Sequence, residues 1–337
     1  MNRRLLLTSS VFLVAGLFGA SCSEDKPDLT IYSGRTDDLI GPLLKDFTEA
    51  TGIKVEVKYG QSPDLALLID EEAEAGKVSA DLFISQSPGA MGYLEDRDRL
   101  QTMPASALDL VPVGVRDDDN HWVGLTGRQR VLVYNTNSID ASTLPTSVFG
   151  LTDAAWSGKI GVAPGNGSFQ DFVTAMRVTE GEAETAAFLE GLAANDPVTY
   201  ENNNAIVEAV ARGEVEVGLV NHYYNYRRLV ELPSSPTANH VFDEGDPGAL
   251  LIITGVAAIE GSNGGDKAME LVKWLLGPQA QEYFANETFE YPLANGTSPS
   301  GEIPAIGFSD VGGIDFADLG AGVERTRQMI TDAGLSG

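Results

Sequence analysis

The fold is decided by residues 29–85, which read LTIYSGRTDDLIGPLLKDFTEATGIKVEVKYGQSPDLALLIDEEAEAGKVSADLFIS. Short β-branched and aromatic runs predict strands, and apolar residues at helical spacing between them predict two helices. Gly52 is the expected stop of the first helix, and Ser62, followed by Pro63, is the expected N-cap of the second. This β-α-β-α-β order predicts a doubly wound α/β lobe with a mainly parallel sheet. The expected elements are strands at 29–32, 53–59 and 81–85 and helices at 39–52 and 62–76.

The alternation of strands and helices resumes in the second half of the chain. Asn204 is the expected N-cap of one helix there, and the long apolar run at 250–259 is consistent with a strand that passes between two lobes. The expected strands lie at 159–163, 215–220 and 250–259, and the expected helices at 168–178, 182–194, 205–212, 268–276, 279–286 and 323–330.

The amino terminus has the features of an export signal. Arg3 and Arg4 precede an apolar run at 5–20 that is too short to favour a membrane span. Small residues then lead to Cys22, the only cysteine, and a polar stretch follows it. We interpret residues 1–21 as a signal peptide and Cys22 as a lipidation site. A plain signal peptide cut near Ala20 is the alternative, and a single cysteine rules out a disulfide scaffold.

Composition limits the possible partners. About 315 of the 337 residues remain after the signal, which suits two lobes better than one core. The formal net charge of −27 argues against nucleic acid and against adhesion to anionic lipid. We therefore expect a protein that contacts the membrane only through a lipid anchor.

A pair of tyrosines follows the strand expected at 215–220. Residues 221–228 read NHYYNYRR, and Tyr223 and Tyr224 stand at the mouth of that strand. Phenolates are anionic oxygen donors, which hard cations prefer. Because a free tyrosine has a pKa of about 10, only a strongly polarising ion such as Fe(III) would hold two phenolates at neutral pH. The alternative is that both tyrosines start a helix and pack against the strand.

Six motifs give the chain a strong resemblance to the periplasmic ferric-ion-binding proteins of ABC transporters. The resemblance runs from about residue 28 to residue 335, and the tyrosine pair is its most specific element. It implies a two-lobed periplasmic-binding-protein type II fold with the ligand in the interlobe cleft. It also implies a monomer that delivers Fe(III) from the periplasm to a membrane permease. The motifs are 29–35 (LTIYSGR), 80–83 (ADLF), 122–128 (WVGLTGR), 131–135 (VLVYN), 156–160 (WSGKI) and 220–224 (VNHYY).

The resemblance also implies a division of the chain into lobes and a set of metal ligands. Residues 28–110 with 250–290 would form the first lobe, and 111–249 with 291–337 the second. Tyr223 and Tyr224 match the paired tyrosine ligands of the family. Thr36, Gln86 and Phe169 stand where some members have an additional His, Glu or Tyr ligand. Octahedral Fe(III) needs about six donors, so the missing ones must come from elsewhere.

An exogenous anion such as carbonate, phosphate or citrate is the expected source of those donors. The glycine-rich run at 164–169 (PGNGSF) precedes a helix, where free N–H groups and the helix dipole favour an anion. Arginine forks suit carbonate, phosphate or carboxylate. The resemblance places the anion beside residues of the 164–169 run, two arginines and further polar side chains. These anion-side candidates are Arg35, Gln86, Arg128, Asn166, Gly167, Ser168, Asn221 and one of Asn203 or Asn204, of which Asn204 is preferred.

Two other functions and the three histidines complete the expectations. A receptor for a preformed ferric chelate, or for an anion such as phosphate, phosphonate or a carboxylate, would also fit the absent His, Glu and third Tyr. A secreted hydrolase is not expected, since the chain has no nucleophile elbow, no His-Glu-x-x-His motif and no plausible triad. His222 is not expected as a ligand because adjacent helical residues point apart, and His121 and His240 have no partner visible in the sequence.

Overall fold

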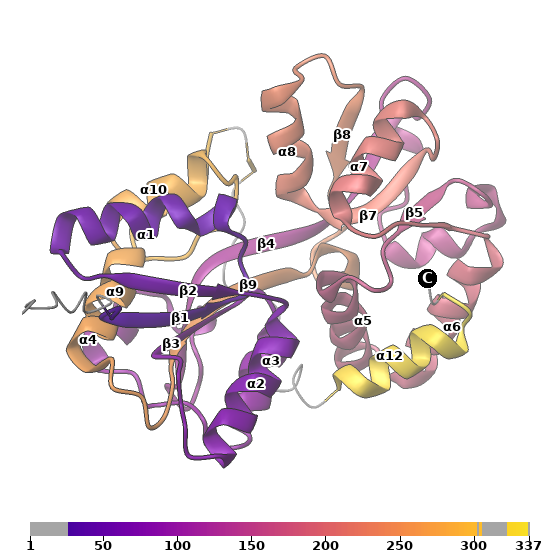
Figure 1. The fold of residues 1–337 in the computed structure, drawn as a ribbon. Coiled ribbons are helices and arrows are strands. Elements are labelled where there is room, and N and C mark those ends of the chain that lie inside the picture. Colours follow the sequence, from indigo (N-terminus) through magenta and orange to yellow (C-terminus); the bar gives the residue numbers. More distant parts are fainter. Residues whose placement is uncertain (1–25, 302, 305–321, 336–337) are drawn as a thin grey trace, which may run out of the picture.

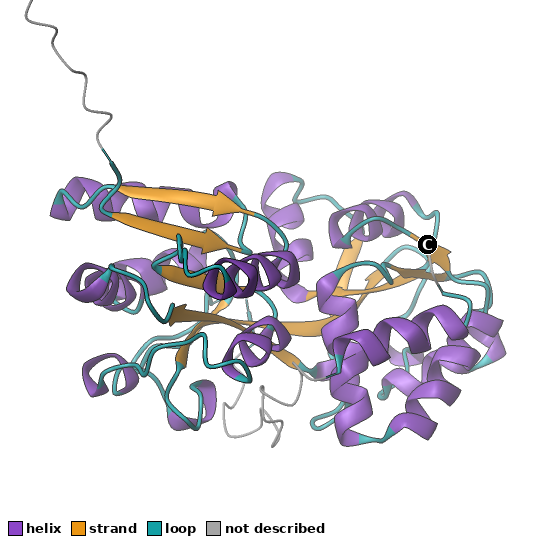
Figure 2. Ribbon diagram, turned by 60° about the horizontal axis from the view of Figure 1, so that its bottom comes forward, coloured by secondary structure: helices purple, strands orange, loops and turns teal. Residues whose placement is uncertain are grey.

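The computed structural model describes residues 26–301, 303–304 and 322–335. They form two α/β lobes joined by extended strands, with helices on both sides of the strands (Figures 1 and 2). This confirms the expected fold class. The expectations for the signal peptide and for Cys22 lie outside the described residues. None of the helices in the described part combines the length and apolar character that a bilayer crossing requires.

The first lobe follows the predicted β-α-β-α-β order. Strand β1 pairs in parallel with both β2 and β3. Helix α1 buries five large apolar residues at helical spacing and ends at Gly52, whose φ of 77° lies in the left-handed region that suits glycine. The elements are β1 (Leu29–Ser33), α1 (Asp37–Thr51), β2 (Val55–Tyr59), α2 (Ser62–Glu74), β3 (Leu82–Ser85), α3 (Pro88–Glu95), α4 (Ala105–Leu108), η1 (Val113–Val115), α9 (Gly265–Leu275), α10 (Pro278–Asn286) and β10 (Tyr291–Pro292).

Two strands connect the lobes. Strand β9 (Leu251–Ala258) lies antiparallel between β3 and β4 (Trp122–Asn135), as the apolar run at 250–259 led us to expect. The longer connection is β4, whose first part pairs with β9 and whose last part pairs with β7 (Val217–Asn221). The sequence motifs gave two separate pieces of β4, and the structure joins them into one strand of 14 residues with an irregular pairing between Gly124 and Thr126.

The second lobe is built on β5 and β7, which pair in parallel. Helix α12, near the carboxyl end of the chain, packs on α5 and α6, as Figure 1 shows. Strand order along the whole sheet is β2-β1-β3-β9-β4-β7-β5-β6. The further elements are η2 (Ala141–Thr143), η3 (Val148–Thr152), η4 (Ala154–Trp156), β5 (Ile160–Val162), α5 (Gly167–Thr179), α6 (Glu182–Ala194), β6 (Val198–Thr199), α7 (Asn203–Arg212), α8 (His222–Glu231), β8 (Thr237–His240), η5 (Pro247–Ala249) and α12 (Val323–Asp332).

Each lobe has its own apolar core. The largest cluster includes Val115, Trp122, Leu125 and Leu293, which fall outside the ranges expected for the first lobe. The assignment of chain segments to lobes stays a prediction, and this cluster suggests that the change of lobe falls later, within β4.

Two predicted helix caps are wrong by one or two residues. Gln61 is the N-cap of α2, and the hydroxyl of Ser62 instead accepts a hydrogen bond of 2.9 Å from the Gln86 amide. Asn202 caps α7 by accepting from the Ala205 amide at 3.0 Å, so Asn204 already lies inside the helix. Only Asn202 caps with its side chain, since Gln61 makes no side-chain hydrogen bond to the first turn of α2.

Candidate functional site

The tyrosine pair lies where β7 ends and α8 begins. Tyr223 is 1% exposed and Tyr224 is half-buried, and their rings stack with centroids 4.1 Å apart. Burial raises the pKa of Tyr223 well above its ordinary value, and the neighbouring Tyr224 adds to this, whereas Arg128 acts in the opposite direction. Both tyrosines do start a helix, as the alternative reading expected, but one of them also faces a cleft.

The cleft between the lobes brings Tyr224 together with most of the expected anion-side residues. Its walls come from the first lobe, from the second lobe and from the connecting strand β4. The lining residues are Gly34, Gln61, Ser62, Pro63, Gln86, Ser87, Arg128, Asn166, Gly167, Ser168, Asp171 and Tyr224.

Arg128 reaches the cleft from the middle of β4, where it is 3% exposed. Its guanidinium donates to the backbone carbonyl of Gln86, while its Nε has no partner. The side-chain nitrogen of Gln86 is also buried without a partner. Two N–H donors at the cleft, Arg128 Nε and Gln86 Nε2, thus have no hydrogen-bond acceptor among the described residues.

The run at 164–169 forms the start of α5. Asn166 is the N-cap and accepts from the Ser168 amide at 3.1 Å, so its side-chain oxygen is already engaged. A side chain added at Gly165 or Gly167 would meet nothing within 4 Å, which shows that the backbone here borders open space. The amides of Asn166 and Ser168 are already hydrogen-bonded, so Gly167 is the residue of this run whose amide can serve an anion in the cleft, at the helix N-terminus that favours one.

The asparagine that joins this run is Asn203. It is 1% exposed and donates to Asn166 Oδ1 at 3.3 Å and to Ser168 Oγ at 3.2 Å. Asn204 is exposed and does not line the cleft beside Arg128. The sequence analysis preferred Asn204, but the structure brings Asn203 to the glycine-rich run.

Two charged residues of the site were missed by sequence reasoning. Asp171 lies on α5, one turn after Gly167, and accepts a hydrogen bond of 2.8 Å from Ser87 across the cleft. Its other oxygen has no partner. Burial raises its pKa to about 6, although Ser87, Arg128 and Arg130 act to lower it. The helical spacing from the glycine-rich run was the available signal.

Arg130 is the second missed residue. It is 1% exposed and donates to the Asn221 side chain at 3.0 Å, but its Nε and Nη2 have no partner. Burial lowers its pKa to about 9, and the nearby Tyr224 acts in the opposite direction. The two-residue interval from Arg128 puts both arginines on one face of β4, a pattern that was readable in the sequence.

Arg35 lies behind the tyrosines and not on the cleft wall. Its two terminal nitrogens donate to the Glu290 carboxylate at 2.9 Å and 2.5 Å, and both side chains are 0% exposed. Glu290 contributes this partner from a position 255 residues later in the chain. Arg35 is therefore committed to an ion pair, which the sequence alone could not show.

His222 sits beside the tyrosines as a neutral side chain. Its Nδ1 accepts from the Gln129 amide at 3.1 Å, and burial lowers its pKa to about 4. Its ring lies 4.8 Å from that of Tyr291. Its Nε2 is buried without a hydrogen-bond partner, and the expectation that His222 is not a ligand stays a prediction.

Comparisons with known proteins agree with the fold. Residues 77–305 match the family model described as bacterial extracellular solute-binding protein. The Fe(3+)-binding periplasmic protein of Serratia marcescens is 28% identical over 98% of this chain and 96% of its own length. The major ferric iron-binding protein of Neisseria meningitidis is 32% identical over 79% of this chain and 81% of its own length. The crystal structure of iron-bound HitA from Pseudomonas aeruginosa superposes with a TM-score of 0.84 at 30% identity, covering 91% of this chain and 99% of that chain.

Proposed function

Because this chain belongs to the bacterial extracellular solute-binding proteins, a family of binding proteins and not of enzymes, we propose that its solute is Fe(III). Tyr223 and Tyr224 would supply two phenolates, and an exogenous anion would complete the coordination. Proteins of this family work with ABC permeases, and delivery to such a permease is part of the proposal. A periplasmic location is supported by the names of the relatives, and a lipid anchor at Cys22 is proposed with it.

The observation that carries the proposal is the set of unpaired polar atoms around the tyrosine pair. Buried polar groups are almost always hydrogen-bonded, so a concentration of unpaired ones marks a place suited to bind a polar or charged ligand. Gln86, Arg128 and Asp171 line the cleft, and Arg130 and Asn221 lie against each other where β4 meets β7. The unpaired atoms are Gln86 Nε2, Arg128 Nε, Arg130 Nε and Nη2, Asp171 Oδ2 and Asn221 Nδ2.

The charges around the cleft favour a dianion beside the metal. Fe(III) with two phenolates carries one positive charge. Arg128 and Arg130 add two positive charges, and Asp171, when ionised, removes one. The excess of two positive charges would be neutralised by carbonate or hydrogen phosphate, or by part of a citrate. Arg128 and the amide of Gly167 are the groups we assign to this anion, because the amides of Asn166 and Ser168 already donate to the Ala163 carbonyl and to Asn166 Oδ1. Arg35 is engaged by Glu290 and is not assigned to the anion.

Closure of the lobes would bury the ligand. Ser87, the N-cap of α3, donates a hydrogen bond to Asp171 of α5, and Arg227 of α8 forms an ion pair of 3.1 Å with Asp38 of α1. Each of these contacts joins one lobe to the other, and each would break if the cleft opened. We propose that ligand binding favours the closed arrangement by filling the cleft between these two contacts, a hinge motion of the kind known for such receptors.

A visible-absorption titration tests the proposal directly. Chelator-stripped protein is titrated with Fe(III) with and without carbonate, phosphate or citrate, and the experiment is repeated on Tyr223→Phe/Tyr224→Phe. We expect a phenolate-to-iron charge-transfer band that needs an anion and vanishes in the double variant. Tyr226→Phe is the matched control, since Tyr226 lies on the same helix but stacks on Phe289. A band that survives the double variant, or never forms, would contradict phenolate ligation.

A second candidate is a receptor of the same fold for a ferric chelate or an anion. It is favoured by Thr36, Gln86 and Phe169, which stand where additional ligands would be expected. Phe169 is 1% exposed in the apolar core of the second lobe and offers no donor. Calorimetry on metal-free protein separates the two candidates, because only an anion receptor should bind the anion with the same affinity whether or not iron is present.

A further inference from the structure

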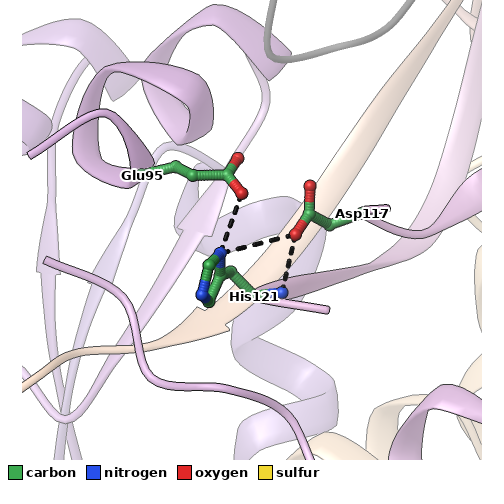
Figure 3. A group of neighbouring side chains, drawn as sticks. All are labelled: Glu95, Asp117 and His121. Carbon is green, nitrogen blue, oxygen red and sulfur yellow. Dashed lines mark hydrogen bonds and ion pairs between the residues drawn. The ribbon is translucent and has the colours of Figure 1, made fainter. Parts of the chain in front are cut away.

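A compact cluster of possible metal ligands lies in the first lobe, away from the cleft. Glu95 ends α3, Asp117 follows η1, and His121 directly precedes β4 (Figure 3). His121 and the cleft residue Arg128 are seven residues apart along an extended strand, so the cluster lies about 20 Å from the cleft. It is therefore a separate site, and nothing in the proposed cargo binding uses it.

The spacing of the three side chains suits a metal ion. One possible ligand atom from each residue lies within 4.8 Å of the others. His121 Nδ1 stands 2.8 Å from Glu95 Oε1 and 3.6 Å from Asp117 Oδ2. With metal–ligand bonds of about 2.1 Å, neighbouring ligand atoms are about 3.0 Å apart in an octahedron and about 3.4 Å apart in a tetrahedron. Small movements of the side chains would bring the observed spacings to either geometry.

The cluster also has an unsatisfied acceptor. The Glu95 side chain is only 12% exposed, and its Oε2 is buried without a hydrogen-bond partner. Within the described residues, neither carboxylate forms an ion pair with a lysine or arginine. Two buried carboxylates thus share a single imidazole, and a cation would balance them.

Asp117 is held in place before any ion arrives. Its Oδ2 accepts from the His121 amide at 2.7 Å, and its side chain is only 5% exposed. The Asn120 amide bonds the Asp117 carbonyl at 3.2 Å and closes the turn between them. Two of the three ligands are therefore positioned by one short turn, which limits the ordering that binding would require.

We propose that Glu95, Asp117 and His121 bind one divalent transition-metal ion, with Zn²⁺ as the best match, independently of the cargo site. One imidazole nitrogen and two carboxylate oxygens form a donor set that suits zinc and its neighbours, whereas Ca²⁺ and Mg²⁺ prefer oxygen alone. Three protein ligands leave at least one position for water. The ion would link the carboxyl end of α3 to the start of β4 and so stabilise the first lobe.

The test is a titration of the purified protein with Zn²⁺ and with Co²⁺, whose visible spectrum reports nitrogen and oxygen ligation. Tyr223→Phe/Tyr224→Phe is used as the background so that the cleft tyrosines cannot bind the probe. We expect one ion per chain, and a melting midpoint about 4 °C higher at a hundred times the Kd. Glu95→Gln and His121→Gln should each weaken the binding at least tenfold, and both are to be checked for an unchanged circular-dichroism spectrum.

His240→Gln is the matched control. His240 is a half-buried histidine of the second lobe whose Nε2 lies 2.8 Å from the Pro145 carbonyl, so its loss should leave the binding unchanged. Equal affinity in the Tyr223→Phe/Tyr224→Phe background with and without Glu95→Gln or His121→Gln would overturn the proposal. So would the absence of saturable Zn²⁺ or Co²⁺ binding up to 1 mM, or a site that takes Ca²⁺ in preference to both, since an imidazole ligand would then be excluded.

Discussion

Replacing Glu290 with glutamine is expected to destabilise the fold by about 3–5 kcal/mol, the usual cost of breaking a buried ion pair. Arg35 and Glu290 are both fully buried and share two hydrogen bonds. A glutamine keeps the shape but removes the negative charge and one acceptor. The Arg35 guanidinium would then remain as an unpaired charge in the interior, directly behind the tyrosine pair.

Urea unfolding at pH 7 measures the loss. Glu287→Gln is the control, since Glu287 is an exposed carboxylate in the same segment and should change the free energy of unfolding by less than about 0.5 kcal/mol. Replacing both partners, as Arg35→Met/Glu290→Leu, should recover most of the stability because no charge is left buried. A loss below about 1 kcal/mol for Glu290→Gln would refute the role of Glu290 as the counter-ion that Arg35 requires.

The pH dependence of the pair has a definite sign. Burial acts to raise the pKa of Glu290, but the charge and hydrogen bonds of Arg35 outweigh it and hold that pKa below its usual range. The stabilisation is therefore fully present above the unfolded pKa, near 4.3, and is lost as the pH falls through the lower folded pKa. The difference between wild type and Glu290→Gln should be constant from pH 6 to 8 and should shrink only in acid.

Three further predictions concern the cleft. Burial leaves Tyr223 protonated at neutral pH, so binding of Fe(III) by both phenolates must release two protons. The apparent affinity for Fe(III), corrected for the iron-supplying chelator, should therefore rise about 100-fold per pH unit between pH 5 and 8. A flat profile would exclude phenolate ligation. Asp171→Asn should stabilise the metal-free protein at pH 7 by about 2 kcal/mol, because the raised pKa of about 6 makes the ionised carboxylate costly in the folded state. That gain should be complete above about pH 6 and absent below about pH 4, and a thermal melt that shows it at pH 3 would contradict the assignment. Gln86→Glu should place a carboxylate beside the unpaired Nε of Arg128. Iron binding without added anion should then strengthen about tenfold, and the dependence of iron binding on carbonate should weaken. If neither the affinity nor the carbonate dependence changes, residue 86 does not reach the anion.

The sequence was sufficient for the elements whose pattern is local. Helix α6 was predicted at the residues where it is found, and α1 ends at the predicted Gly52, because helical spacing and a left-handed glycine are readable within a few residues. Strand β4 was not recognised as one strand, since Gly124, Gly127 and two arginines interrupt its apolar pattern. These glycines and arginines are buried by neighbouring strands and by the tyrosines. Such contacts come from distant parts of the chain and cannot be read from the local sequence.

The candidate site divides in the same way. Tyr223, Tyr224 and the glycine-rich run were identifiable because each is a contiguous motif. The ion pair between Arg35 and Glu290, and the hydrogen bond between Ser87 and Asp171, depend on segments that meet only in the folded chain. The cluster of Glu95, Asp117 and His121 was missed for that reason, although two of its members are only four residues apart.

Strand β4 brings the crossing between the lobes and two arginines of the candidate site into the same few residues. Gln129 is the last residue of β4 that pairs with β9, and Arg130 is the first that pairs with β7. Arg128 and Arg130 therefore stand on either side of the point where the strand changes sheets. Any twist of the strand at that point must change the angle between the two guanidinium groups. If Arg128 and Arg130 hold the anion as proposed, a change in the angle between the lobes would change the affinity for it. Substitutions that stiffen this point would then be measured as changes in binding even though they touch no ligand.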